Sequence, residues 1–136
     1  MAKLGRYSAD RKKIESVTAS KTVEVHDCGT VFLAVGDAAV TLTLPEIDNA
    51  GEGWWCKVIK TGAASGGQDI TISAAAADGS SPMMGVESSA TPAVMNGDDI
   101  VIADAANKGT QIEILCDGTN WQVLGHAALA AGITIS

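Results

Sequence analysis

The chain alternates apolar and polar residues with a period of two over most of its length, and this period predicts β-strands. The most regular stretch is residues 40–44, where a valine and two leucines alternate with two threonines. Pro45 follows and ends the strand, because proline has no backbone N–H to donate. The pattern predicts a strand with one buried apolar face and one polar face.

Residues 109–125 predict a β-hairpin. Two apolar-rich runs, at residues 111–116 and 121–124, flank a turn of sequence Asp-Gly-Thr-Asn. Gly118 tolerates a positive φ, and the Asp and Asn side chains of such a turn can bond the local backbone. The hairpin is therefore expected to set a heavy apolar face against the core.

Residues 54–60 predict a strand with two different faces. One face is Trp54, Cys56 and Val58, and the other is Trp55, Lys57 and Ile59. The first face is expected to lie in the core, and the second is half apolar. A half-apolar second face can meet a neighbouring protein.

Further short strands are predicted at residues 22–26, 30–35, 69–73, 84–87, 93–95, 99–103 and 133–135. We expect about eight to ten of these short runs to form strands, the pattern of an all-β fold: an antiparallel β-sandwich, a jelly roll or a small barrel. Aromatic residues make up only 4% of the chain, so a few large side chains must anchor an otherwise aliphatic core. The predicted core anchors are Trp54, Trp121, Phe32, Leu42 and Leu44.

Residues 1–20 are polar and basic without a strand pattern, and they predict an extended N-terminal arm before a single β domain at residues 21–136. Residues 1–27 contain six basic and four acidic residues, whereas residues 28–136 contain three and twelve. An acidic body argues against direct nucleic-acid binding, which needs clustered Lys and Arg. No apolar segment is long enough to span a membrane and no signal peptide is evident, so synthesis in a cytoplasm is expected.

The sequence contains no catalytic motif, and no catalytic, cofactor-binding or metal-binding residue is predicted. His26 and His126 lie in no nucleophile motif, and the three cysteines have no zinc spacing, so buried reduced thiols are expected. Two weaker alternatives stay open. Loop aspartates can supply oxygen ligands to calcium, namely Asp78, Asp98, Asp99, Asp104 and Asp117. The three tryptophans can form a sugar-stacking platform if two of them face solvent together.

The order of these features resembles that of small β-rich capsid decoration proteins (cement, head-stabilising or head-fibre proteins) from tailed bacteriophages of aquatic bacteria. The resemblance rests on residues 17–23, 28–33, 40–45, 112–121 and 132–135. It implies a non-enzymatic virion protein that binds the outer surface of the capsid and stabilises contacts between major capsid protein subunits. It also implies a homotrimer. The alternative is a head-fibre or tail-associated module that binds a host surface or a glycan.

Two groups of residues are candidates for these contacts. The basic arm is expected to order on an acidic capsid surface or to add a strand to a capsid sheet edge. Its candidate residues are Lys3, Arg6, Tyr7, Arg11, Lys12 and Lys13. The second face of residues 54–60 is expected to form the contact between subunits, through Trp55, Lys57 and Ile59.

Overall fold

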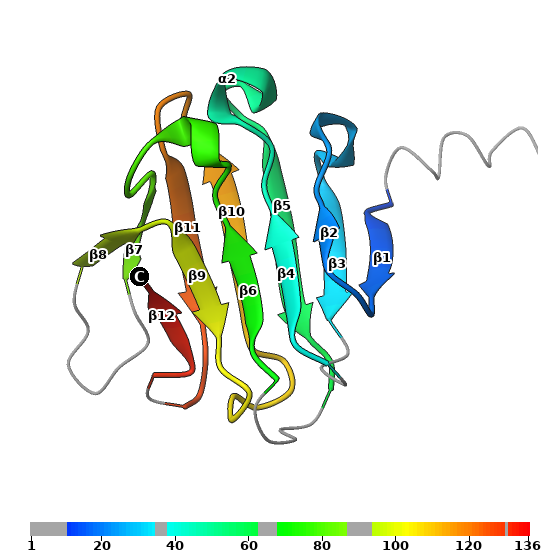
Figure 1. The fold of residues 1–136 in the computed structure, drawn as a ribbon. Coiled ribbons are helices and arrows are strands. Elements are labelled where there is room, and N and C mark those ends of the chain that lie inside the picture. Colours follow the sequence, from blue (N-terminus) through cyan, green and yellow to red (C-terminus); the bar gives the residue numbers. More distant parts are fainter. Residues whose placement is uncertain (1–10, 35–37, 63–67, 87–93, 130) are drawn as a thin grey trace, which may run out of the picture.

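The structure is a computed structural model that describes residues 11–34, 38–62, 68–86, 94–129 and 131–136. These residues form two mixed β-sheets that face each other across one apolar core, a sandwich-like all-β arrangement (Figure 1). The larger sheet has the strand order β1 (Lys13–Val17), β3 (Thr30–Ala34), β5 (Trp55–Lys60), β10 (Gln111–Cys116), β11 (Trp121–His126), β7 (Met83–Val86) and β8 (Val94–Gly97). The smaller sheet has the order β12 (Ile133–Ile135), β9 (Asp99–Ile102), β6 (Ile70–Ser73), β4 (Val40–Thr43) and β2 (Lys21–Thr22). Three short helical turns lie between strands: η1 (Val25–Asp27), α2 (Ile47–Ala50) and η2 (Ala76–Asp78).

The first half of the chain winds from one sheet to the other. β1, β3 and β5 lie in the seven-stranded sheet, and β2, β4 and β6 lie in the five-stranded sheet. Each strand therefore runs parallel to the next strand of its own sheet. The second half adds mostly antiparallel pairs, including the β10–β11 hairpin predicted from the sequence.

This winding corrects the prediction of an antiparallel sandwich, because both sheets are mixed. The two kinds of pairing share the same period of two, so the pattern of apolar residues does not reveal the direction of the neighbouring strand. Each sheet keeps two edges, so the described strands do not close into a barrel. They number twelve rather than eight to ten, partly because β1 arises within the predicted arm.

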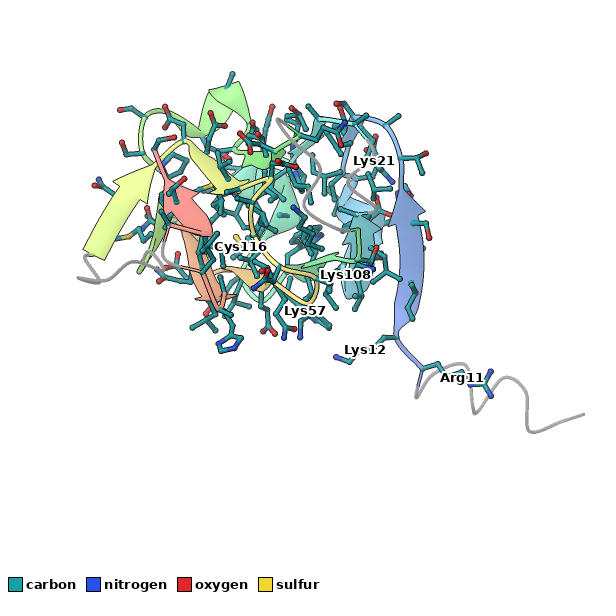
Figure 2. All side chains as sticks on the ribbon, turned by 90° about the horizontal axis from the view of Figure 1, so that it is seen from below. Arg11, Lys12, Lys21, Lys57, Lys108 and Cys116 are labelled. Carbon is teal, nitrogen blue, oxygen red and sulfur yellow. The ribbon has the colours of Figure 1, made fainter. Side chains whose placement is uncertain are left out.

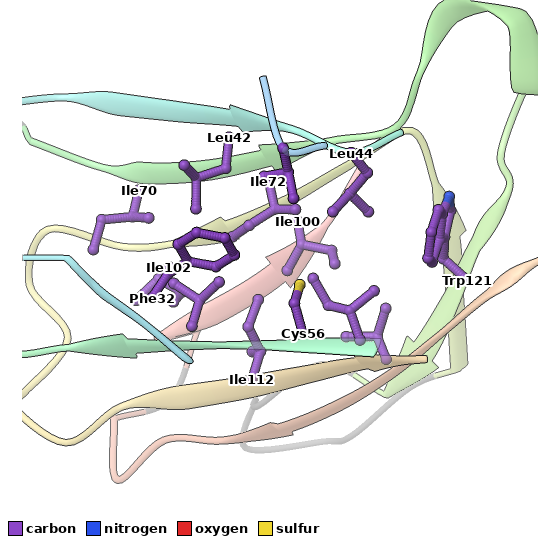
Figure 3. Packing of buried hydrophobic residues seen from close by; sticks show 14 of the residues in the cluster. Phe32, Leu42, Leu44, Cys56, Ile70, Ile72, Ile100, Ile102, Ile112 and Trp121 are labelled. Carbon is purple, nitrogen blue, oxygen red and sulfur yellow. The ribbon is translucent and has the colours of Figure 1, made fainter. Parts of the chain in front are cut away.

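The core lies between the inner faces of the two sheets (Figure 3). Isoleucine, leucine and valine side chains from β4, β6 and β9 face those of β5 and β10, and Phe32 lies among them. All five predicted anchors are at most 3% exposed. Trp54 and Trp121 meet edge to face, with ring centroids 5.5 Å apart and an interplanar angle of 77°. The two indoles close one end of the core.

Hydrogen bonds hold both indole rings in place. The Nε1 of Trp54 donates to the carbonyl oxygen of Val25 at 2.8 Å, and the Nε1 of Trp121 donates to Oδ2 of Asp78 at 3.4 Å. Oδ1 of Asp78 accepts the backbone N–H of Ile47 at 2.8 Å. Asp78 therefore ties the start of α2 to the C-terminal hairpin.

Lys60 is the exception on the inner face of β5, because its side chain is only 1% exposed. Its ammonium donates to the backbone carbonyl of Ala103, with an Nζ–O distance of 3.2 Å, and to that of Asp104. A buried charge is tolerated where such acceptors replace water. Lys60 thus fixes the end of β5 to the connection between β9 and β10.

We expect Trp121→Ala to lower the free energy of unfolding by about 3 to 5 kcal/mol, because it leaves a large cavity in the core. Trp121→Phe is expected to cost less, since it keeps most of the apolar volume. Thr119→Ala is the matched control in the exposed turn of the same hairpin, with an expected change within about 0.5 kcal/mol. Urea denaturation of the three variants measures these differences. A Trp121→Ala variant as stable as the control would contradict the role of Trp121 as a core anchor.

Candidate docking surface

The face of the seven-stranded sheet that points away from the core is the candidate docking surface, and we call it the outer face. Residues in register on neighbouring strands point to the same side of a sheet. The central row of the outer face runs across β1, β3, β5, β10 and β11 as Ile14, Val31, Lys57, Glu113 and Leu124. One flanking row contains Trp55, Leu115 and Gln122, and the other contains Leu33, Ile59, Gln111 and His126.

The outer face exposes large apolar side chains. Leu124 is 67% exposed, Ile14 is 64% exposed and Leu115 is 37% exposed. Trp55 and Ile59 lie between them and are half-buried. Single exposed apolar residues are ordinary on protein surfaces, but several of them on the same face of one sheet are typical of an interaction surface.

Lys57 and Glu113 lie at the centre of this face, in register on β5 and β10. Neither side chain forms an ion pair with another residue that the structure describes, because the three such pairs involve Lys13 or Lys21. A hollow of about 240 Å³ lies beside them and is lined by Lys57, Gln111, Glu113, Leu124, Gly125 and His126. The centre of the face therefore presents one positive and one negative charge next to open space.

The basic segment at the start of the described chain continues onto the outer face. The ammonium of Lys12 lies over the indole of Trp55, 4.7 Å from the ring centroid, which is within the range of a cation–π contact. Figure 2 shows Lys12 and Lys57 on the same side of the molecule, with Lys21 on the other side. The structure thus brings together two predicted sites that are far apart in the sequence. Lys3, Arg6 and Tyr7 of the predicted arm lie outside the described residues.

Lys13 has a structural role that differs from the arm contact predicted for it. It begins β1, which lies inside the range predicted as an arm but pairs in parallel with β3. Its Nζ lies 3.0 Å from Oδ1 of Asp27, whose side chain is only 4% exposed. Lys21 lies 3.9 Å from the same carboxylate and 2.6 Å from Glu15. These charges join β1, β2 and η1 at one edge of the sandwich.

The pKa of the Asp27 carboxyl is lowered by this environment. Burial by itself raises the pKa, but the backbone N–H of Glu24, which donates to Oδ2 at 3.0 Å, and the ammonium groups of Lys13 and Lys21 outweigh that effect. In the same pair, the hydrogen bond to Asp27 is the main cause of a raised pKa at Lys13. The charged form of the pair is therefore the stable one.

The other candidate groups do not converge on one site. Asp78 and Asp98 accept backbone N–H groups, and Oδ1 of Asp117 accepts those of Thr119 and Asn120 inside the hairpin turn. Within the described ranges, no group of three or more His, Cys, Asp or Glu residues is placed to hold a metal ion.

Burial raises the pKa of the Cys56 thiol, so this thiol stays protonated. Cys28 is exposed, which corrects the expectation of three buried cysteines. It follows η1 rather than lying inside a strand.

The residues of the outer face that were not among the sequence candidates include Glu113, Leu115 and Leu124 of the hairpin. The alternation of the hairpin strands already places them opposite the core-facing residues, so their orientation was predictable. Their position beside Trp55 and Lys57 was not, because β10 follows β5 by 50 residues and four intervening strands. Strand neighbours that distant in sequence are decided by tertiary packing.

We expect Asp27→Asn to lower the free energy of unfolding at pH 7 by about 2 kcal/mol, the scale of hydrogen bonds to a charged group. Because the pKa of Asp27 is lower in the folded state, its contribution is present above the unfolded value near 3.8 and is lost as the pH falls below it. The difference between wild type and variant is therefore expected to shrink from pH 7 to pH 3. Urea titrations across this range measure it, with Asp48→Asn on the exposed α2 as control. A constant difference would show that the carboxylate charge is not involved.

No protein-family model matches this chain, and no curated protein sequence matches it. Within the described residues, no helix is both long enough and apolar enough to cross a membrane. The candidate docking surface is therefore assigned from its own residues: an exposed apolar face with a central Lys and Glu, bordered by the basic residues that precede β1.

Proposed function

We propose that this protein is a structural, non-enzymatic component of a tailed-bacteriophage virion. It binds the outer surface of the capsid as a homotrimer and stabilises contacts between major capsid protein subunits. The observation that carries the proposal is the outer face of the seven-stranded sheet, which exposes apolar side chains and continues into the basic residues Arg11 and Lys12. The resemblance to capsid decoration proteins, which covers most of residues 17–136, supplies the identity of the partner.

The distribution of charge supports a contact between the arm and an acidic surface. Most of the negative charge belongs to residues 28–136, whereas six of the nine basic residues lie within residues 1–27. Arg11 is exposed, and Lys12 reaches Trp55 at the border of the outer face. Complementary charge accelerates the encounter with an acidic partner and sets the orientation in which the two proteins meet. The arm is thus suited to the capsid contact.

The tryptophans favour docking over glycan binding. A sugar platform needs exposed aromatic faces, but Trp54 and Trp121 are 3% and 0% exposed and pack against each other. Trp55 is half-buried and carries the ammonium of Lys12 over its ring. The indoles therefore support a rigid body and a protein contact better than a stacking site for sugars.

Co-sedimentation with empty, expanded phage capsids tests the proposed function. We expect the wild-type protein to pellet with capsids at saturating stoichiometry, and its intrinsic tryptophan fluorescence to stay unchanged on titration with host-surface glycans. Light scattering of the free protein is expected to give the mass of a trimer. Failure to bind capsids of the phage that encodes the protein, together with saturable quenching by a glycan, would replace this proposal with the host-binding alternative.

A variant lacking residues 2–12 tests the contribution of the arm. This deletion leaves β1 intact, because β1 begins at Lys13. We expect capsid affinity to fall roughly tenfold or more through the loss of four basic residues, each worth up to about 1 kcal/mol. A full-length variant with Lys3, Arg6, Arg11 and Lys12 replaced by Gln separates charge from strand addition. If the deletion binds as tightly as the wild type, the arm is not the capsid contact.

A further inference from the structure

The central residues of the outer face are complementary to one another. β5 and β10 are adjacent and antiparallel, and their outward residues pair in register as Lys57 with Glu113 and Trp55 with Leu115. On the β5 side of this line the central row continues to Val31 and Ile14, and on the β10 side it continues to Leu124. One half of the face is therefore positive and apolar, and the other half is negative and apolar.

A partner that fits this face must present the reverse arrangement. A uniformly acidic or uniformly basic surface would satisfy one of the two central charges and repel the other. A second copy of the same face presents a Glu where a Lys is needed and a Lys where a Glu is needed, with apolar residues on both flanks. Among partners, a copy of this chain thus has the complementary charge pattern.

The direction of the symmetry axis follows from the rows. Rotation about an axis parallel to β5 and β10 does not shift residues along the strand direction, so each row stays level with the same row of the next copy. The rotation brings the β5 half of one copy onto the β10 half of the next. Lys57 then meets Glu113, and Trp55 meets Leu115. An axis across the strands would instead place Lys57 against Lys57 of the neighbour, which like-charge repulsion opposes.

We propose that copies of this protein associate through their outer faces around a three-fold axis parallel to β5 and β10. Lys57 of each copy pairs with Glu113 of the next copy, and the exposed Leu124 packs against the exposed Ile14 of its neighbour. The three-fold order of the axis rests on the trimer of the proposed function, while the residue pairing rests on the face alone. The hollow of about 240 Å³ between Lys57, Glu113 and Leu124 receives the side chain of the neighbouring Lys57.

The contact explains two features of the face together. Lys57 and Glu113 lie side by side without forming an ion pair within one copy, which leaves both charges available to neighbouring copies. Ile14 and Leu124, the two most exposed large apolar residues described, lie at opposite ends of the central row. Cyclic association buries both of these ends at once.

Charge exchange tests the pairing, with the native mass of the full chain measured by sedimentation equilibrium. We expect Lys57→Glu and Glu113→Lys each to weaken association roughly tenfold or more, and the double variant to regain most of it. Lys108→Glu and Asp48→Lys change the net charge equally on exposed loop and helix positions and are expected to leave association unchanged. Single variants that associate as well as these controls, or a double variant no better than the singles, would overturn the pairing.

Two further measurements separate loss of association from loss of the fold, and a three-fold from a two-fold contact. Leu124→Asp alters a side chain that is 67% exposed in the isolated chain, so it is expected to abolish association while thermal unfolding shows an intact fold. An equimolar mixture of Lys57→Glu and Glu113→Lys separates a three-fold from a two-fold contact. In any trimer that contains both variants, two neighbouring subunits carry the same substitution, so one of the three contacts stays repulsive and association is not restored. In a two-fold dimer of the two variants, both contacts pair a Lys with a Glu.

A stable heterodimer in this mixture would overturn the three-fold arrangement. These results are independent of capsid binding. If association depends on Lys57 and Glu113 but no variant, nor the wild type, binds capsids, the pairing stands and the proposed function fails. If capsid binding is found with a wild-type monomer at all concentrations, the pairing fails and the proposed function loses only its trimer.

Discussion

The pairing of β5 with β10 is the contact on which the rest of the structure depends. It joins the wound first half of the chain to the C-terminal hairpin, and backbone hydrogen bonds extend it at both ends. The N–H of Cys116 donates to the carbonyl of Trp54, and the N–H of Lys60 donates to the carbonyl of Thr110, both at 2.8 Å. On the inner side this pairing sets Cys56 and Val58 beside Ile112 and Ile114 in the core. Without it, the two halves would not share one core.

The same pairing generates the docking surface, because the period of two sends every second side chain to the opposite side. Once Val58 and Ile112 are fixed inward, Lys57 and Glu113 must point outward as neighbours. The charge pattern on the outer face is therefore a direct consequence of core packing. A one-residue slip of β10 against β5 would bury Glu113 and expose Ile112, so selection for the core also holds the outer face in register.

At the N-terminal edge of the sandwich, charged side chains rather than a further strand join β1 and β2 to the rest of the structure. Edge strands expose unpaired backbone groups, and inward-pointing charged residues are one way in which proteins prevent uncontrolled strand addition there. Lys21 lies 5.3 Å from the ring centroid of Phe32 and binds Glu15, while Asp27 holds Lys13 on β1. This network fixes β1 to the body, so Lys12, which directly precedes β1, lies beside Trp55. The position of Lys12 at the border of the outer face therefore depends on this network.

Much of the architecture was predictable from the residues alone. Strict alternation located β4, β5 and the β10–β11 hairpin, and it assigned Trp55, Lys57 and Ile59 to one face, because side-chain direction in a strand is a local property. Tertiary structure decided what alternation leaves open. The winding between two sheets made the pairs of the first half parallel and added Lys13–Val17 as β1. The packing of the hairpin placed Glu113 and Leu115 beside β5, with Leu124 one strand further away on β11. Local sequence determines which way a side chain points, whereas the packing of distant strands into one core determines which side chain it stands next to.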